Sequence, residues 1–160
     1  MPDNKYHKRD IARCQLETAV VLFLNKRDLS SVITLAGAAA NILDRLVRNE
    51  GKEAFVEYAR RVHRDTVGFM PKRQSYSHHI DKSVGTIAHK HMGKDEPEEV
   101  DLDLDKMAYD ALSRALADYI ELNGQDDPFV KAFLSWSWKN MDGHTLMEEY
   151  MKVPERLKPR

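Results

Sequence analysis

Apolar residues recur at steps of three and four along most of the chain, which is the period of an amphipathic α-helix. The clearest example runs over residues 32–47, where the rhythm persists for about four turns. Asp28 or Ser30 is placed to cap the start of this helix, and Gly51 is a natural stop. We therefore expect a long helix here, with a wide apolar face.

The middle of this helix consists of Gly37 surrounded by alanines. Small side chains allow another helix to approach closely, so we place this helix at the centre of the fold. Glycine costs about 1 kcal/mol relative to alanine within an exposed helix, and close packing would offset that cost. The alternative is that Gly37 is simply tolerated.

The same period, with turn residues between the segments, predicts the remaining helices. They cover residues 9–25, 52–64, 72–93, 106–123 and a stretch opening at Pro128, followed by a short segment over 146–150. The aromatic residues Phe129, Phe133 and Trp136 share one face of the Pro128 helix, and we expect them to be core residues first.

The period changes from helical to alternating near residues 100–104. Val100, Leu102 and Leu104 alternate there with aspartates, which predicts a short extended segment with one buried face. Asp105 would then cap the following helix. The aspartates lack the central glycine and distal glutamate of a calcium-binding EF-hand loop, so we interpret them as a solvated face.

These elements predict an all-α fold, a single bundle of about five to seven helices with the short extended segment near residues 100–104. A chain of 160 residues is the size of one domain. We expect residues 1–160 to form a single helical domain, with an ordered core over about 9–152 and a frayed C-terminal tail.

Composition narrows the functional classes. The chain has 25 Lys+Arg against 26 Asp+Glu, and these charges do not give the basic excess of a dedicated DNA-binding protein. It has one cysteine, no run of about 18 apolar residues and no secretory signal pattern at its start. We expect a cytoplasmic protein that does not insert in membranes. No phosphate-binding glycine loop and no metal motif is present, so we expect no cofactor and no metal.

The densest group of candidate functional residues lies between residues 76 and 105, which contain four of the seven histidines and an acidic run. Ligands that share a metal on one helix need steps of three or four. His89 and His91 are two apart, so their side chains point about 200° apart around the axis. A metal site within this helix is therefore not expected.

His91 continues the apolar stripe of the predicted 72–93 helix. It is either a histidine at the edge of the core or a site residue at a helix C-terminus. In the second case Asp95 lies nearby, and both the helix end and the carboxylate favour the protonated ring. Arg73 and His78 show a further pattern, an arginine followed after four residues by a histidine. HEPN-type ribonucleases use that spacing to act on RNA in a groove at a dimer interface.

The chain resembles a family of small, uncharacterised bacterial proteins over about residues 15 to 140. The shared segments are 16–19 (LETA), 34–43 (TLAGAAANIL), 90–97 (KHMGKDEP) and the aromatic helix 129–136. The chain departs from the family pattern at His89 and Gly93. The resemblance implies an all-α fold and a kinship with HEPN-like bundles.

Two functions therefore stay open. One is a non-enzymatic helical module that binds a protein partner. The other is a HEPN-like module that acts on RNA in a defence or toxin system, with His91, Asp95, Arg73 and His78 as its catalytic candidates. We also expect a homodimer, because the apolar width of the first two helices exceeds what one neighbouring helix covers.

Overall fold

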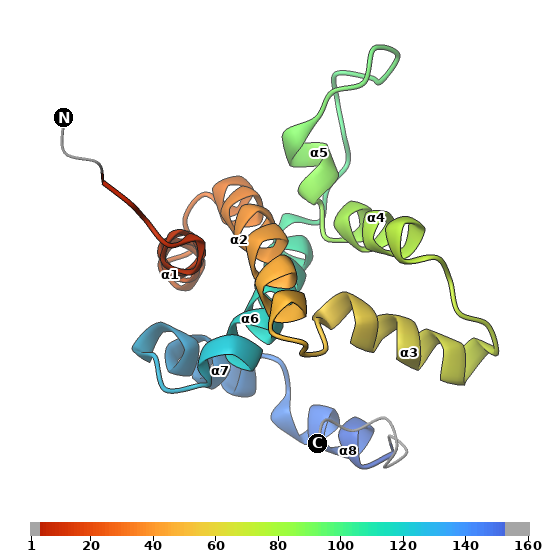
Figure 1. The fold of residues 1–160 in the computed structure, drawn as a ribbon. Coiled ribbons are helices and arrows are strands. Elements are labelled where there is room, and N and C mark those ends of the chain that lie inside the picture. Colours follow the sequence, from red (N-terminus) through yellow and green to blue (C-terminus); the bar gives the residue numbers. More distant parts are fainter. Residues whose placement is uncertain (1–3, 153–160) are drawn as a thin grey trace. The chain divides into compact units, whose positions relative to one another are not determined.

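The computed structural model describes residues 4–152, and these residues contain eight α-helices and no strand (Figure 1). The prediction of an all-α helical fold is confirmed. Residues 1–124 and 125–160 form two compact units. The single-domain organisation stays a prediction, and the predicted frayed tail over residues 153–160 lies outside the described residues.

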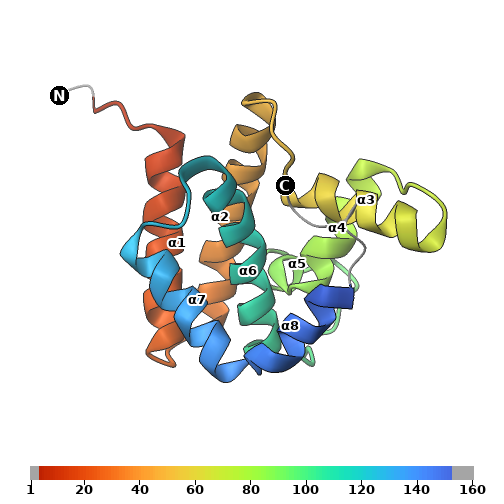
Figure 2. The ribbon, with the colours of Figure 1, turned by 90° about the horizontal axis from the view of Figure 1, so that it is seen from below.

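The first unit is built around one central helix. Its helices are α1 (Lys8–Leu24), α2 (Leu29–Asn49), α3 (Phe55–Val67), α4 (Arg73–Ser83), α5 (Thr86–Lys90) and α6 (Leu104–Asn123). Helix α2 packs along both α1 and α6 (Figures 1 and 2). The fully covered side chains of this core include Leu16, Val20, Ile33, Leu43, Leu112 and Leu116. The predicted central position of α2 is confirmed.

The small residues of α2 receive the short helix α5. A Cβ added at Gly37 would lie 2.6 Å from Cγ2 of Thr86, far inside van der Waals contact. Gly37 is therefore required for this close approach, which confirms the packing interpretation. Asp28 caps α2, since its carboxylate accepts the backbone N–H of Ser31 at 3.3 Å.

Helix α2 is also relevant to the expectation that the protein does not insert in membranes. By length and composition it is apolar enough to cross a membrane, and half of its most apolar 18-residue window is buried within the protein. The expectation of a cytoplasmic protein that does not insert in membranes stays a prediction. A core helix of a globular protein passes the same test.

The prediction of one long helix over residues 72–93 is wrong, because the helix is interrupted at Gly85. Helix α4 ends at Ser83 with Val84 as its C-cap, and Gly85, with a left-handed φ of 80°, redirects the chain into α5. This break gives one more helix than the upper end of the predicted number. It also removes His91 from the apolar stripe, since His91 follows α5 with extended backbone and an exposed side chain.

Residues 91–103 connect α5 to α6 without helix or strand. Val100 is exposed, so the predicted buried face of this segment is not formed at that position. The cap of α6 is Asp103, which accepts the backbone N–H of Lys106 at 3.1 Å. The prediction of Asp105 as the cap was two residues late, because α6 begins at Leu104 and Asp105 lies in its first turn.

The second unit contains α7 (Pro128–Asn140) and α8 (Gly143–Lys152), which pack on each other. Pro128 opens α7 as predicted. Phe129 and Phe133 are buried, which confirms them as core residues. The turn between the helices depends on Gly143, because an added Cβ there would lie 2.8 Å from the indole of Trp138.

Candidate functional site

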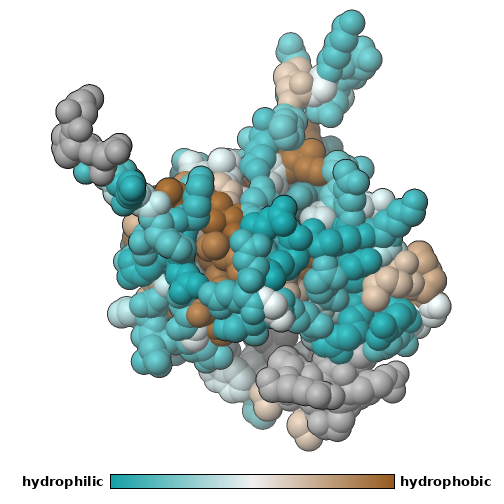
Figure 3. All heavy atoms as spheres, viewed as in Figure 1, coloured by the Kyte–Doolittle hydropathy of each residue, from teal (hydrophilic) through white to brown (hydrophobic). Residues whose placement is uncertain are grey.

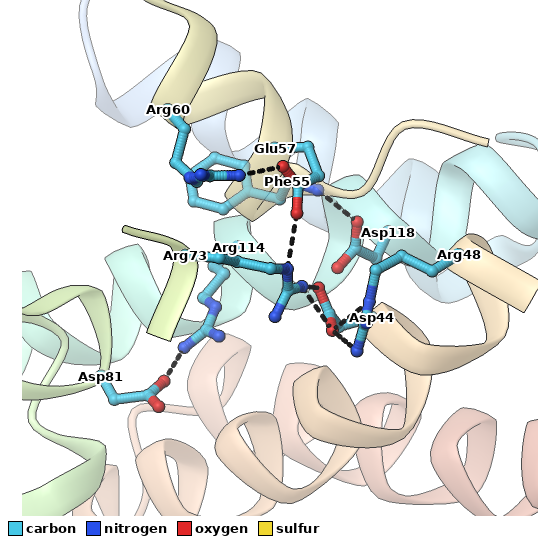
Figure 4. A network of polar contacts seen from close by, with 9 residues as sticks. All are labelled: Asp44, Arg48, Phe55, Glu57, Arg60, Arg73, Asp81, Arg114 and Asp118. Carbon is cyan, nitrogen blue, oxygen red and sulfur yellow. Dashed lines mark hydrogen bonds and ion pairs between the residues drawn. The ribbon is translucent and has the colours of Figure 1, made fainter. Parts of the chain in front are cut away.

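Arg73, the first residue of α4, joins three helices of the first unit. Its Nη2 donates to both carboxylate oxygens of Asp44 on α2, at 2.7 and 2.9 Å. Its Nε donates to Oε1 of Glu57 on α3 at 2.5 Å. Figure 4 shows the guanidinium held between these two carboxylates. The arginine is therefore a clamp between α2, α3 and α4.

Further arginines complete the clamp. Arg48 donates from Nε to Oδ2 of Asp44 at 3.0 Å, and Arg60 donates from Nη1 to Oε2 of Glu57 at 2.6 Å. Burial alone would raise the pKa of Glu57, but hydrogen bonds from Arg73 and Arg60 outweigh it and hold that pKa below its usual range. Burial likewise lowers the pKa of Arg73, and its bonds to Glu57 and Asp44 more than reverse this. The clamp thus holds three charged arginines against two charged carboxylates.

Asp118 of α6 provides a second link to α3. Its Oδ1 accepts the backbone N–H of Phe55, the first residue of α3, at 2.7 Å. The N-cap residue Ala54 has no side chain that could take this role. Asp118 is only 2% exposed, and its burial raises its pKa to about 6 even though the Phe55 N–H favours the charged form.

Arg114 of α6 forms a third link, to α4. Its Nη1 donates to Oδ1 of Asp81, and Figure 4 shows the guanidinium directed toward that carboxylate. Arg114 is 4% exposed although it is a charged residue. The α3–α4 hairpin (residues 55–83) is thus tied to α2 and α6 largely by acid–base contacts, since its buried apolar residues are only Val56 and Ile80 among those described.

A pocket of about 440 Å³ lies where α3, α4 and α6 meet. Its lining has an apolar part, made of Phe55, Ala59, Tyr76, Ile80 and Val84. It also has a polar part, made of Ser83, Tyr109, Asp110, Ser113 and Arg114. The polar part comes mainly from one face of α6.

The four catalytic candidates from the sequence are not brought together. Arg73 is engaged in the clamp, His78 is exposed on α4, and His91 and Asp95 are exposed in the connection after α5. Across residues 4–152, no hydrogen bond or ion pair joins any two of them. In the same residues, no three or more His, Cys, Asp or Glu side chains lie close enough to hold a metal ion.

Among the histidines of residues 76–105, His89 makes hydrogen-bonding contacts with both ring nitrogens. Its Nδ1 lies 2.7 Å from the carbonyl oxygen of Gly85, and its Nε2 lies 3.0 Å from Oγ of Ser30. These contacts join α5 to the start of α2. His89 therefore has a structural place in the fold, a role that was one of the two alternatives for His91.

Sequence reasoning overlooked the acidic and basic residues that make these links. Asp44 interrupts the apolar face of α2 beside Leu43 and Val47. Asp118 and Arg114 likewise lie within the buried face of α6. A charged residue on an otherwise apolar helical face is a signal for a buried polar contact, because such a residue is rarely covered without a partner.

Comparison of the chain with protein-family models, with curated proteins and with solved structures gives no match in any of the three. The resemblance to a bacterial all-α family and to HEPN-like bundles stays a prediction.

Proposed function

We propose that this chain is a helical interaction module that binds a protein partner through the exposed turn between α3 and α4. The observation that carries the proposal is the state of Arg73. A guanidinium that acts on an RNA phosphate must be free to meet it, whereas Arg73 already bonds two carboxylates. This engagement of Arg73 supports a structural role for the arginine in place of a role at an RNA phosphate.

The α3–α4 turn supplies the candidate contact surface. Val67, Phe69 and Met70 are 61%, 60% and 40% exposed and lie within four consecutive residues. The view in Figure 3 shows mostly hydrophilic residues, together with brown hydrophobic patches elsewhere on the same face. Neighbouring exposed apolar side chains within a hydrophilic surface are typical of a protein–protein contact.

A homodimer is one form of this proposal, although the physical reason for it changes. The apolar residues of α1 and α2 are largely buried within a single copy of the chain, so their width no longer calls for a second copy. The α3–α4 turn is the surface on which a second copy would bind.

The test uses two variants that change exposed residues only. Val67→Ser with Met70→Ser reduces the apolar character of the turn and keeps Phe69, and Val21→Ser is a matched control at a valine of α1 that is 50% exposed. Proximity labelling in the source cells should identify proteins whose labelling is lost in the double variant and kept in the control. Equal labelling by all three proteins would contradict the proposal.

Sedimentation of the same purified proteins separates the two kinds of partner. A dimer that the double variant dissociates and the control retains identifies the partner as a second copy. A monomer in every case, together with selective loss of labelling, identifies a different protein. RNA cleavage that depends on Arg73 and His78 would replace the proposal by the HEPN-like alternative.

A further inference from the structure

We propose that the pocket between the α3–α4 hairpin and α6 binds a small zwitterion with an apolar side group, of the class of the hydrophobic α-amino acids. This inference is independent of partner binding at the α3–α4 turn, because the pocket is lined by other residues.

The polar part of the pocket presents one negative and one positive side chain on the same face of α6. Asp110, Ser113 and Arg114 are spaced by three and four residues, so they are neighbours along the helix surface. Among the described residues, Asp110 pairs with Lys106 and Arg114 pairs with Asp81, and the two are not paired with each other. Opposite charges are thereby held side by side at the pocket wall.

Arg114 has donors left for a ligand carboxylate. A guanidinium carries five N–H groups, and the described contacts of Arg114 use only Nη1, toward Asp81. Nε and Nη2 are on the other edges of the same planar group and match a carboxylate in two parallel hydrogen bonds. Because Arg114 is 4% exposed, few water molecules compete for these donors.

The charge balance of the lining selects a zwitterion. A simple anion at Arg114 would lie close to the Asp110 carboxylate, and a simple cation at Asp110 would lie close to the Arg114 guanidinium. A ligand with an ammonium and a carboxylate on one carbon satisfies both groups at once. Ser113, between them on the helix, can hydrogen-bond to either ligand group.

The apolar part of the pocket receives the side group. Phe55, Tyr76, Ile80 and Val84 surround it with aromatic and branched surfaces. The volume of about 440 Å³ lies in the range of pockets that hold small ligands, about 300–1,000 Å³. A large apolar side group, as in phenylalanine, leucine or tryptophan, therefore fits better than that of alanine or glycine.

Calorimetric titration with three related probes tests the charge pattern. L-Phenylalanine carries both charges, 3-phenylpropionate only the carboxylate, and phenethylamine only the ammonium. Hydrogen bonds to charged groups contribute about 1.5–3 kcal/mol, so each single-charge probe should bind at least about tenfold more weakly than phenylalanine. No binding by phenylalanine, leucine or tryptophan at millimolar concentration, or equal binding of all three probes, would overturn the proposal.

Variants on the solvent side of α6 avoid disturbing the buried Arg114. Asp110→Asn should weaken phenylalanine binding at least about tenfold and leave the binding of 3-phenylpropionate unchanged or improved. Lys106→Ala removes the surface partner of Asp110 without changing the pocket lining, so phenylalanine should bind this control as tightly as the wild type or tighter. Phenylalanine affinity that is equal in the wild type and Asp110→Asn would contradict the assignment.

Discussion

Oδ1 of Asp118 accepts the backbone N–H of Phe55 at 2.7 Å, so a carboxylate of α6 caps the first turn of α3 from 63 residues away in the chain. This contact takes the place of the local capping side chain that Ala54 lacks. The contact requires the ionisable side chain of Asp118 to be almost fully buried. The same contact therefore couples the position of the α3–α4 hairpin to pH.

The first prediction concerns the pH dependence of stability. The pKa of Asp118 is raised from 3.8 to about 6, so between these values the folded state binds more protons than the unfolded state. The contribution of Asp118 to stability thus decreases as pH rises through this window. Asp118→Asn keeps an acceptor and cannot ionise, so relative to the wild type it should gain up to about 3 kcal/mol between pH 4 and pH 7.

Denaturant unfolding at several pH values measures this gain. Asp118→Ala is the control, because it removes both the charge and the acceptor. It should be less stable than Asp118→Asn at every pH, by about 1–2 kcal/mol for the lost cap of α3. The same pH dependence in the wild type and Asp118→Asn would show that Asp118 titrates normally.

The second prediction concerns the contact between α2 and α5. Gly37→Ala places a methyl group against Thr86, and overpacking of this kind costs about 1–3 kcal/mol. Thr86→Ala removes the atoms that the new methyl group would meet. In a double-mutant cycle, Gly37→Ala should therefore cost less in the Thr86→Ala background than alone. Additive costs in thermal or denaturant unfolding would mean that the two side chains do not meet.

The third prediction concerns the clamp at Arg73. Arg73→Ala leaves the buried Asp44 with Arg48 as its only ion-pair partner among the described residues, and should destabilise the protein by about 1–3 kcal/mol. The stability of Arg73→Lys should lie between those of Arg73→Ala and the wild type, since an ammonium retains the charge but lacks the planar array of donors. Lys131→Ala, at an exposed pair with Asp126, is the control and should change stability by less than about 0.5 kcal/mol.

Acid titration of the same variants gives a further measure of the clamp. The pKa of Glu57 is held below its usual range, so the stability that this carboxylate contributes is present above its unfolded-state pKa and is lost as pH falls through the folded-state value. Without Arg73 the folded-state pKa rises. The stability lost on acidification should therefore be smaller in Arg73→Ala than in the wild type, and an unchanged acid profile would contradict the assignment.

The sequence predicts the fold well where local signals agree. The rhythm of α2, its Asp28 cap and the end of α6 at Asn123 all follow from neighbouring residues. The failure at Gly85 has a physical reason: one glycine inside a continuous helical period is compatible with both a helix and a break. Its left-handed conformation accompanies the packing of α5 against α2, and neighbouring residues in the sequence do not reveal that tertiary contact.

The candidate site was less predictable, because the histidine-rich segment over residues 76–105 predicted a site there and is mostly exposed in the structure. His78 and His91 lie at the surface, and the covered polar contacts belong to Asp44, Asp118 and Arg114. These three were visible in the sequence as charges on apolar helical faces. Their partners, however, lie on other helices and cannot be assigned without the tertiary arrangement.

Arg73 is held in the fold by Asp44 and Glu57, and we propose that the arginine–histidine spacing is not a ribonuclease site. The most direct measurement is the rate of cleavage of single-stranded RNA by the purified wild type and by His78→Ala, whose exposed side chain can be removed without unfolding α4. The account predicts no cleavage above a protein-free blank for either protein. Cleavage by the wild type that His78→Ala abolishes, at unchanged thermal stability, would contradict it.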